Sequence, residues 1–136
     1  MERILVNDGS KSYEIVNQDD EVLGVFRFNP SDSNIIEKYN GVVESLEAAF
    51  QKVDAGDEEF VMEASREIKE KFDDLFGQNT SKTFFSITGP LTPLSNGQLF
   101  AENVVEAIGF IIEKEMKVRV KKVQERMNKY TEKYKK

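Results

Sequence analysis

The sequence contains no cysteine and no histidine. Their absence excludes disulfide bonds, thiolate nucleophiles, histidine-based catalytic triads, and zinc or iron sites built on sulfur or imidazole ligands. No apolar run reaches the roughly 18 residues that are needed to span a bilayer, and the first residues lack the basic and then apolar segment of a signal peptide. We therefore expect a cytoplasmic protein with no membrane association.

Motifs for phosphate, calcium or acid–base chemistry are also missing. Gly77, Gly89 and Gly97 are scattered, without the lysine and serine that complete a phosphate-binding loop. The acidic clusters lack the spacing of a calcium-binding hand, and we interpret them as solvated surface. These clusters are Asp19-Asp20-Glu21, Asp57-Glu58-Glu59 and Asp73-Asp74. The sequence therefore predicts a protein that is not an enzyme and holds no metal or cofactor.

The first 28 residues have the composition of short strands. Three segments are rich in β-branched and aromatic residues, and the residues between them are typical of turns. Asp8-Gly9 has the composition of a tight hairpin turn. The predicted strands are Arg3 to Val6, Tyr13 to Val16, and Val22 to Phe28. We expect a small antiparallel β-meander with one face covered by helices, because so small a sheet is marginal alone.

Helical patterns follow this predicted sheet. Asn29-Pro30 ends the last strand, and Ser31, Asp32 or Ser33 can cap the next helix. Apolar residues then recur every three or four positions, as on one face of a helix. This period predicts a helix from Ile35 to Val53 and a second from about Glu59 to Phe76, with Gly77 as its carboxyl-terminal cap. Asn79-Thr80-Ser81 offers another cap. A short helix within Lys82 to Ser86 is expected to follow and to present Phe84 or Phe85.

The longest helical pattern closes the sequence. A helix from Gln98 to Tyr134 is roughly 55 Å long, whereas a compact domain of this size is roughly 35 to 40 Å across. Part of the helix is therefore expected to project, fold back or meet a partner. Its apolar stripe follows steps of three or four residues: Ala101, Val105, Ile108, Ile112, Met116, Val120, Val123, Met127, Tyr130 and Tyr134.

The end of this stripe is our candidate partner-binding surface. Beyond Met116 the stripe narrows to about two residues in seven, which is the width of a coiled-coil seam. Methionine and tyrosine make such a surface adaptable. We expect another polypeptide to cover it, either a second copy or a client, while a fold back onto the meander is the alternative. The candidate residues are Met116, Val120, Val123, Met127, Tyr130 and Tyr134.

Charge divides the sequence into an acidic part and a basic end. The net charge is −6, but residues 1–112 hold 21 acids and 9 bases while residues 113–136 hold 4 acids and 10 bases. The basic end could bind a phosphate backbone, which makes a nucleic-acid-associated adaptor the alternative function. We favour a solvated helix that binds protein, because four acids precede bases by four residues, as in Glu113 with Lys117 and Glu115 with Arg119. Nucleic acid is thus not the expected partner.

Several short motifs together resemble a known family. They are Phe28-Asn29-Pro30-Ser31-Asp32 before a helix, Phe72-Asp73-Asp74-Leu75-Phe76-Gly77 followed by Asn79-Thr80-Ser81 and Phe84, and Phe100-Ala101-Glu102-Asn103 at the start of a long helix. With this order, residues 22–120 resemble the small tail assembly chaperones of long-tailed phages and prophages of Gram-positive bacteria. The first two predicted strands and the last 16 residues lie outside the resemblance.

The resemblance implies a function that the residue patterns alone do not reach. Such proteins are non-enzymatic, self-associate, and keep the hydrophobic helical tape-measure protein soluble until tail-tube subunits polymerise around it. Many are also made in a longer, frameshifted form, so this chain would be the short form. The implied partners are the tape-measure protein, the tail-tube protein and further copies of the chain, in the cytoplasm of the bacterial host.

Together these observations predict one α+β domain. We expect a small N-terminal antiparallel β-meander in residues 1–28, followed by a helical bundle in residues 31–112. The basic end of the long C-terminal helix, residues 113–136, is expected to project from the bundle.

Overall fold

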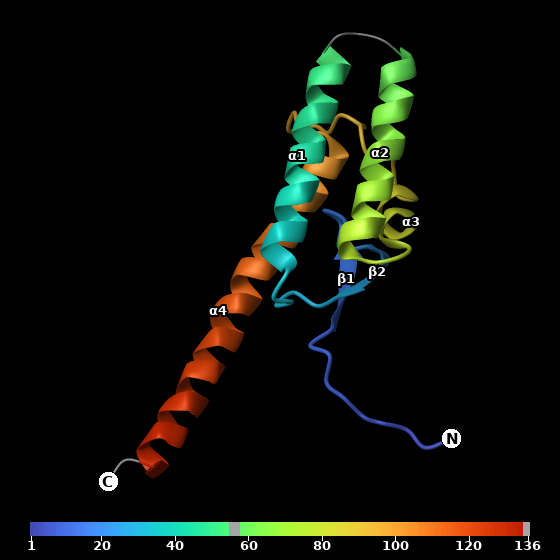
Figure 1. Ribbon diagram of the computed structural model, residues 1–136. Coiled ribbons are helices and arrows are strands. Elements are labelled where there is room, and N and C mark those ends of the chain that lie inside the picture. Colours follow the sequence, from blue (N-terminus) through green and yellow to red (C-terminus); the bar gives the residue numbers. More distant parts are fainter. Residues whose placement is uncertain (55–57, 135–136) are drawn as a thin grey trace.

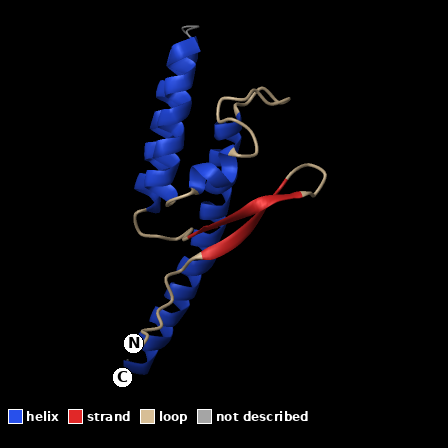
Figure 2. Cartoon of the chain, turned by 90° about the vertical axis from the view of Figure 1, so that its right-hand side faces the viewer, coloured by secondary structure: helices blue, strands red, loops and turns tan. Residues whose placement is uncertain are grey.

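A computed structural model describes residues 1–54 and 58–134 of the chain. Within these residues, two strands precede four helices (Figure 1). The helices pack on one face of the strands (Figure 2). The predicted α+β class, with an N-terminal antiparallel sheet, a helical bundle and a long C-terminal helix, is confirmed.

The sheet is a two-stranded hairpin. β1 (Lys11–Val16) pairs antiparallel with β2 (Val22–Phe28), and a bulge interrupts the register between Ile15 and Val16. The turn between the strands is held by Asn17, whose Oδ1 accepts hydrogen bonds from the backbone N–H groups of Asp19 and Glu21. An asparagine side chain that binds its own backbone in this way is a common turn device. The predicted turn after Val16 is therefore confirmed.

The strand predicted at Arg3 to Val6 is wrong. This segment is exposed and pairs with no described strand, and Asp8-Gly9 does not form a hairpin turn. Instead the carbonyl oxygen of Asp8 accepts a hydrogen bond from Asn29 Nδ2, and that of Gly9 accepts one from Arg119 Nη1. These contacts hold the chain before β1 in a direction that leads away from the hairpin.

The first two helices form an antiparallel pair. α1 (Ile35–Asp54) and α2 (Glu58–Phe76) lie side by side, as Figure 1 shows. Asp32 Oδ1 accepts a 2.8 Å hydrogen bond from the N–H of Asn34 just before α1. Gly77 ends α2 with φ +116°, a left-handed conformation that glycine adopts without strain. Both predicted helices are confirmed, while Ala55–Asp57 and the side chains of Val53 and Phe60 lie outside the described part.

The short helix α3 (Thr80–Phe85) is fixed by α2 rather than by the cap that the sequence suggested. Asn79 makes no side-chain capping bond. Instead the carboxylate of Asp73 accepts hydrogen bonds from the N–H and the hydroxyl of Ser81, at 2.8 and 2.7 Å. Both Phe84 and Phe85 are buried. Asp73 is therefore a structural residue, not solvated surface.

The long helix α4 (Phe100–Tyr134) is continuous over 35 residues, or about 52 Å. Its start is held by the preceding loop, where the N–H groups of Phe100 and Ala101 donate to the carbonyl oxygens of Thr92 and Pro90, each at 2.9 Å. These bonds explain why the helix starts two residues after the predicted Gln98. Residues 135–136 lie outside the described part.

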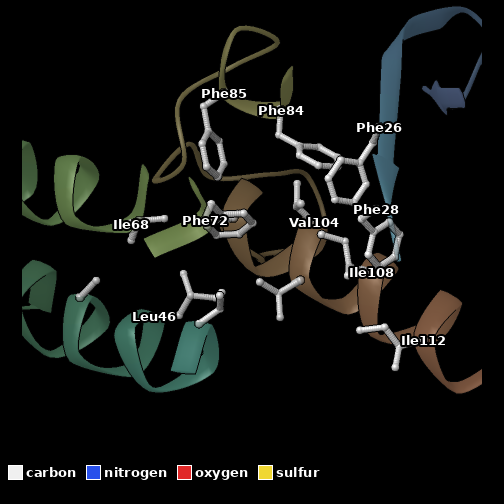
Figure 3. Packing of buried hydrophobic residues seen from close by; sticks show 14 of the residues in the cluster. Phe26, Phe28, Leu46, Ile68, Phe72, Phe84, Phe85, Val104, Ile108 and Ile112 are labelled. Atoms are coloured by element: carbon white, nitrogen blue, oxygen red, sulfur yellow. The ribbon is translucent and has the colours of Figure 1, made fainter. Parts of the chain in front are cut away.

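The core lies where the hairpin, α1, α2, α3 and the first half of α4 converge (Figure 3). Phenylalanine rings link the layers: Phe26 of β2 contacts Phe84 of α3 with ring centroids 4.9 Å apart, and Phe72 of α2 contacts Phe85 at the same distance. Edge-on contacts of this kind stabilise beyond the burial of area alone. Hydrophobic side chains that are buried include Ile35, Val42, Leu46, Ile68, Val104, Val105, Ile108 and Ile112.

Candidate partner-binding surface

The character of α4 changes midway along its length. Up to Ile112 its inward face is buried against the core, and Ala101 and Ile108 have almost no exposed surface. From Val120 to Lys129, by contrast, every side chain is exposed. Figure 1 shows this second half running away from the other elements. The helix therefore projects, as its length predicts, and it does not fold back onto the hairpin.

The predicted stripe lies on this projecting half. Met116 is half-buried and packs against the core, so it marks the boundary. Val120, Val123 and Met127 are 45, 60 and 59% exposed. The side chains of Tyr130 and Tyr134 lie outside the described part. We call Met116, Val120, Val123 and Met127 the distal stripe, an apolar strip that continues the buried face of α4 into solvent.

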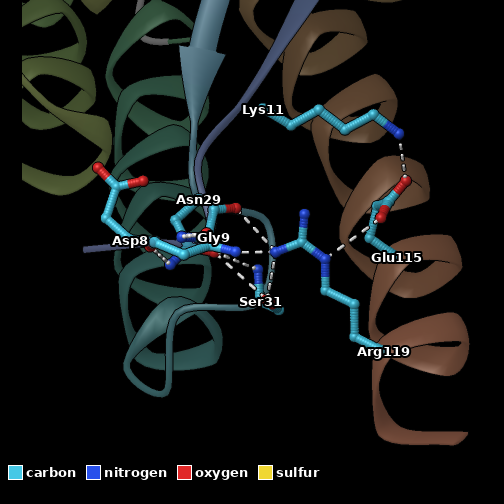
Figure 4. Close-up of polar contacts among 8 residues, drawn as sticks. Asp8, Gly9, Lys11, Asn29, Ser31, Glu115 and Arg119 are labelled. Atoms are coloured by element: carbon cyan, nitrogen blue, oxygen red, sulfur yellow. Dashed lines mark hydrogen bonds and ion pairs between the residues drawn. The ribbon is translucent and has the colours of Figure 1, made fainter. Parts of the chain in front are cut away.

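A small polar cluster marks where the body ends (Figure 4). Arg119 Nη1 donates to the carbonyl oxygen of Gly9 at 2.8 Å and to the hydroxyl of Ser31 at 2.7 Å. Its Nε lies 3.4 Å from Glu115, which also accepts a 2.9 Å hydrogen bond from Lys11 Nζ at the start of β1. Arg119 thus joins α4 to the segments before β1 and α1. This cluster sets the direction in which the distal stripe leaves the body.

The ion pairs shift the pKa values of the groups involved. The hydrogen bond from Lys11, together with the positive charges of Lys11 and Arg119, lowers the pKa of Glu115. The same hydrogen bond raises the pKa of Lys11. Both groups are therefore held in their charged forms at neutral pH. There each stabilises the polar cluster around Arg119, which we call the junction.

Basic side chains surround the distal stripe without covering it. Lys121, Lys122, Arg126 and Lys129 are all exposed. Of the predicted pairs along the helix, Glu113 with Lys117 and Glu115 with Arg119 form, at 3.3 and 3.4 Å. Such pairs stabilise a helix in water by a few tenths of a kcal/mol each. The surface is thus a narrow apolar strip with cationic flanks.

A second surface feature is a shallow depression between α1 and α4. It has a volume of about 450 Å³, and its walls include Ile36, Tyr39, Glu106, Phe110 and Glu113. Burial and the charge of Glu106 raise the pKa of Tyr39, which keeps this phenol protonated and inactive as a base near neutral pH. Among the described residues no group of histidine, cysteine, aspartate or glutamate side chains could hold a metal ion.

Sequence reasoning missed two features of this surface. The contacts of Arg119 with Gly9 and Ser31 span 110 and 88 residues of chain, and the sequence suggested only its local pair with Glu115. The exposure of Ile4, Leu5 and Val6 was missed because their composition is that of a paired strand. Neither feature has a local signal, since both depend on where distant segments meet.

Comparisons with known proteins gave no further assignment. A scan against protein-family models, a search of curated proteins and a search of solved structures each returned no match to this chain. Within the part of the chain that the structure describes, no helix is both long enough and apolar enough to cross a bilayer.

Proposed function

We propose that this protein is a non-enzymatic assembly chaperone that binds a hydrophobic helical client and keeps it soluble in the host cytoplasm. The client class that best fits the motif resemblance is the tape-measure protein of a long-tailed phage, with the tail-tube protein as a later partner. The observation that carries the proposal is the distal stripe, which extends a buried apolar face beyond the body of the domain into solvent.

The shape and chemistry of the distal stripe suit a helical client. Its residues lie one or two helical turns apart, so they can interdigitate with the side chains of a second helix. A fully buried valine or methionine contributes roughly 1.5–3 kcal/mol relative to the exposed side chain. Covering the stripe therefore supplies enough free energy for reversible binding. The cationic flanks keep the complex hydrated.

Two valines of α4 provide a matched test. Val118 and Val120 are equally exposed, at 45%, but Val120 belongs to the distal stripe and Val118 lies roughly 200° away around the helix. We expect Val120→Asp to abolish solubilisation of a co-expressed phage tape-measure protein, because it buries a carboxylate in the contact. Val118→Asp should leave solubilisation at the wild-type level. The soluble fraction of the client after centrifugation is the measurement.

The outcomes of this test separate the proposal from its rivals. Failure of the wild-type protein to keep the client soluble would overturn the chaperone function. Equal activity of the two variants would show that the client binds elsewhere.

A nucleic-acid adaptor is the second candidate function, because Lys121, Lys122 and Arg126 are exposed together on the projecting half of α4. The adaptor would be favoured if binding to duplex DNA falls by several orders of magnitude between low and high salt. It would also require that Lys122→Glu weakens this binding while the uncharged change Val120→Asn does not.

A further inference from the structure

Among the described residues, those of the segment before the hairpin form the most exposed apolar part. Ile4, Leu5 and Val6 are 91, 98 and 72% exposed. Residues 1–6 make no hydrogen bond with any other described residue. Three consecutive aliphatic residues of high β-propensity are a typical strand sequence, and a monomer gains nothing by exposing them. We call residues 1–6 the arm.

The root of the arm is nevertheless held firmly. Asn29 Nδ2 donates to the carbonyl oxygen of Asp8 at 2.7 Å, and Arg119 donates to that of Gly9 at 2.8 Å. Gly9 has φ +80°, and a side chain there would meet Asn29 at 2.8 Å. Glycine is therefore required at this turn. The arm is presented in a set direction, away from its own hairpin (Figure 1).

The hairpin offers a surface on which such an arm can pair. Its sheet has only two strands, so among the described residues both outer edges lack a neighbouring strand. A two-stranded sheet is marginal, and a third strand stabilises it. The face turned away from the core also exposes Val16, Leu23 and Val25. An added strand would place some of its aliphatic side chains beside these residues.

We propose that the arm of one copy adds as a third strand to the hairpin of a second copy. The arm of six residues spans roughly 20 Å, which is close to the length of the seven-residue β2, the strand that it would join. The arm carries Glu2 and Arg3, and the outward face of the hairpin carries Arg27 and Glu14, so each charge on the arm has an opposite charge available.

A second copy of this chain is the occupant because it supplies donor and acceptor in equal number. Each chain has one arm and one hairpin, and a two-fold exchange satisfies both at once. The exchange involves the arm and the hairpin, whereas Val123 and Met127 of the distal stripe lie further along α4 than Glu115 and Arg119, which contact the segments around β1. The inference is therefore independent of the proposed chaperone function, which needs the stripe exposed for a client.

Light scattering of the full chain tests this exchange. We expect the wild-type protein to be a dimer or larger at micromolar concentration, and the double variant Ile4→Asp with Leu5→Asp to have the mass of a monomer. Met62→Asp is the matched control, because Met62 is 76% exposed on α2, and it should keep the wild-type mass. A monomeric wild-type protein, or an arm variant with the wild-type mass, would overturn the proposal.

Circular dichroism shows whether the double variant is still folded. The arm contacts no described residue of its own protomer through hydrogen bonds, so the double variant should keep the helical signal of the wild type. The client assay reports separately on the chaperone function. An arm variant that is monomeric but still solubilises the client would confirm the arm exchange. It would also show that dimer formation by the arm is separate from client binding by the distal stripe.

Cross-linking locates the contact. Because the chain has no cysteine, Leu5→Cys in a tagged copy and Val25→Cys in an untagged copy introduce the only thiols. On mild oxidation we expect a disulfide between the two copies at least tenfold more abundant than with Met62→Cys in place of Val25→Cys. Equal yields for the two pairs would contradict strand addition.

Discussion

The two halves of α4 share one helical period but have opposite environments. In the first half, Val104, Ile108 and Ile112 are buried against the hairpin, α1 and α3. In the second half, Val120, Val123 and Met127 follow the same spacing and stand in solvent. The difference lies in the width of the apolar face, because additional apolar residues flank the stripe only in the first half.

Periodicity thus identifies a helix, whereas the width of its apolar face indicates how that helix is covered. A wide face is buried by several elements of its own domain. A narrow strip suits contact with a single helix. The boundary at Arg119 separates these two situations within one continuous helix.

Two aliphatic truncations, one in each half of α4, should differ strongly in their cost to stability. Ile108→Ala should lower the free energy of unfolding by about 2–5 kcal/mol, because it opens a cavity in the core. Val123→Ala should change it by less than about 0.5 kcal/mol, because the side chain is exposed. Urea denaturation of both variants is the measurement. Similar losses would show that the second half of α4 is packed in the protomer.

The boundary itself should contribute less than the core. Arg119→Ala removes hydrogen bonds to Gly9 and Ser31 and should destabilise the fold by about 1–2 kcal/mol. Arg126→Ala, seven residues further along the exposed half, is the control and should have no measurable effect. If thermal unfolding shows the two variants to be equally stable, the junction does not hold α4 to the body.

A third variant tests how α3 is held against the first half of α4. Asp73 fixes α3, whose Phe85 contacts Phe100 of α4 with ring centroids 6.1 Å apart. Asp73→Ala should destabilise the protein by about 1 kcal/mol through loss of this cap. The neighbouring Asp74 is exposed, and Asp74→Ala should be neutral. Equal denaturation midpoints for the two variants would contradict the capping role.

The smallest expected effect is a pH dependence at the junction. The pKa of Glu115 is lowered in the folded protein, so its stabilisation is present at neutral pH and is lost as pH falls below about 4. The pKa of Lys11 is raised, so its contribution is lost as pH rises above about 10. The difference in melting temperature between wild type and Glu115→Gln should therefore shrink below pH 4. A constant difference from pH 7 to pH 3 would exclude this role of the ion pair.

Local patterns in the sequence were sufficient to predict most of the fold. The period from Ile35, the glycine after Phe76 and the turn residues after Val16 each act within a few residues, and the structure confirms the elements they predict. The failure at Arg3 to Val6 has a physical reason. Strand composition specifies a preference for pairing, whereas the contacts of Asn29 and Arg119 with the root of the arm determine where the chain goes.

The candidate surface could be predicted only in part. Helix length and stripe width predicted that the end of α4 projects, and the exposure of Val120, Val123 and Met127 agrees with a surface open to a partner. The partner itself stays a prediction. Arg119 could not be recognised as the junction, because its partners come from the segments before β1 and before α1.

Amide hydrogen exchange along α4, measured with and without a co-purified phage tape-measure protein, tests whether the distal stripe binds a helical client. We predict that residues 101–112 are protected in both samples, and that residues 120–129 exchange rapidly in the protein alone and become protected with the client. Protection of residues 120–129 in the protein alone, or rapid exchange of them in the complex, would contradict the claim that the distal stripe is the surface for a helical client.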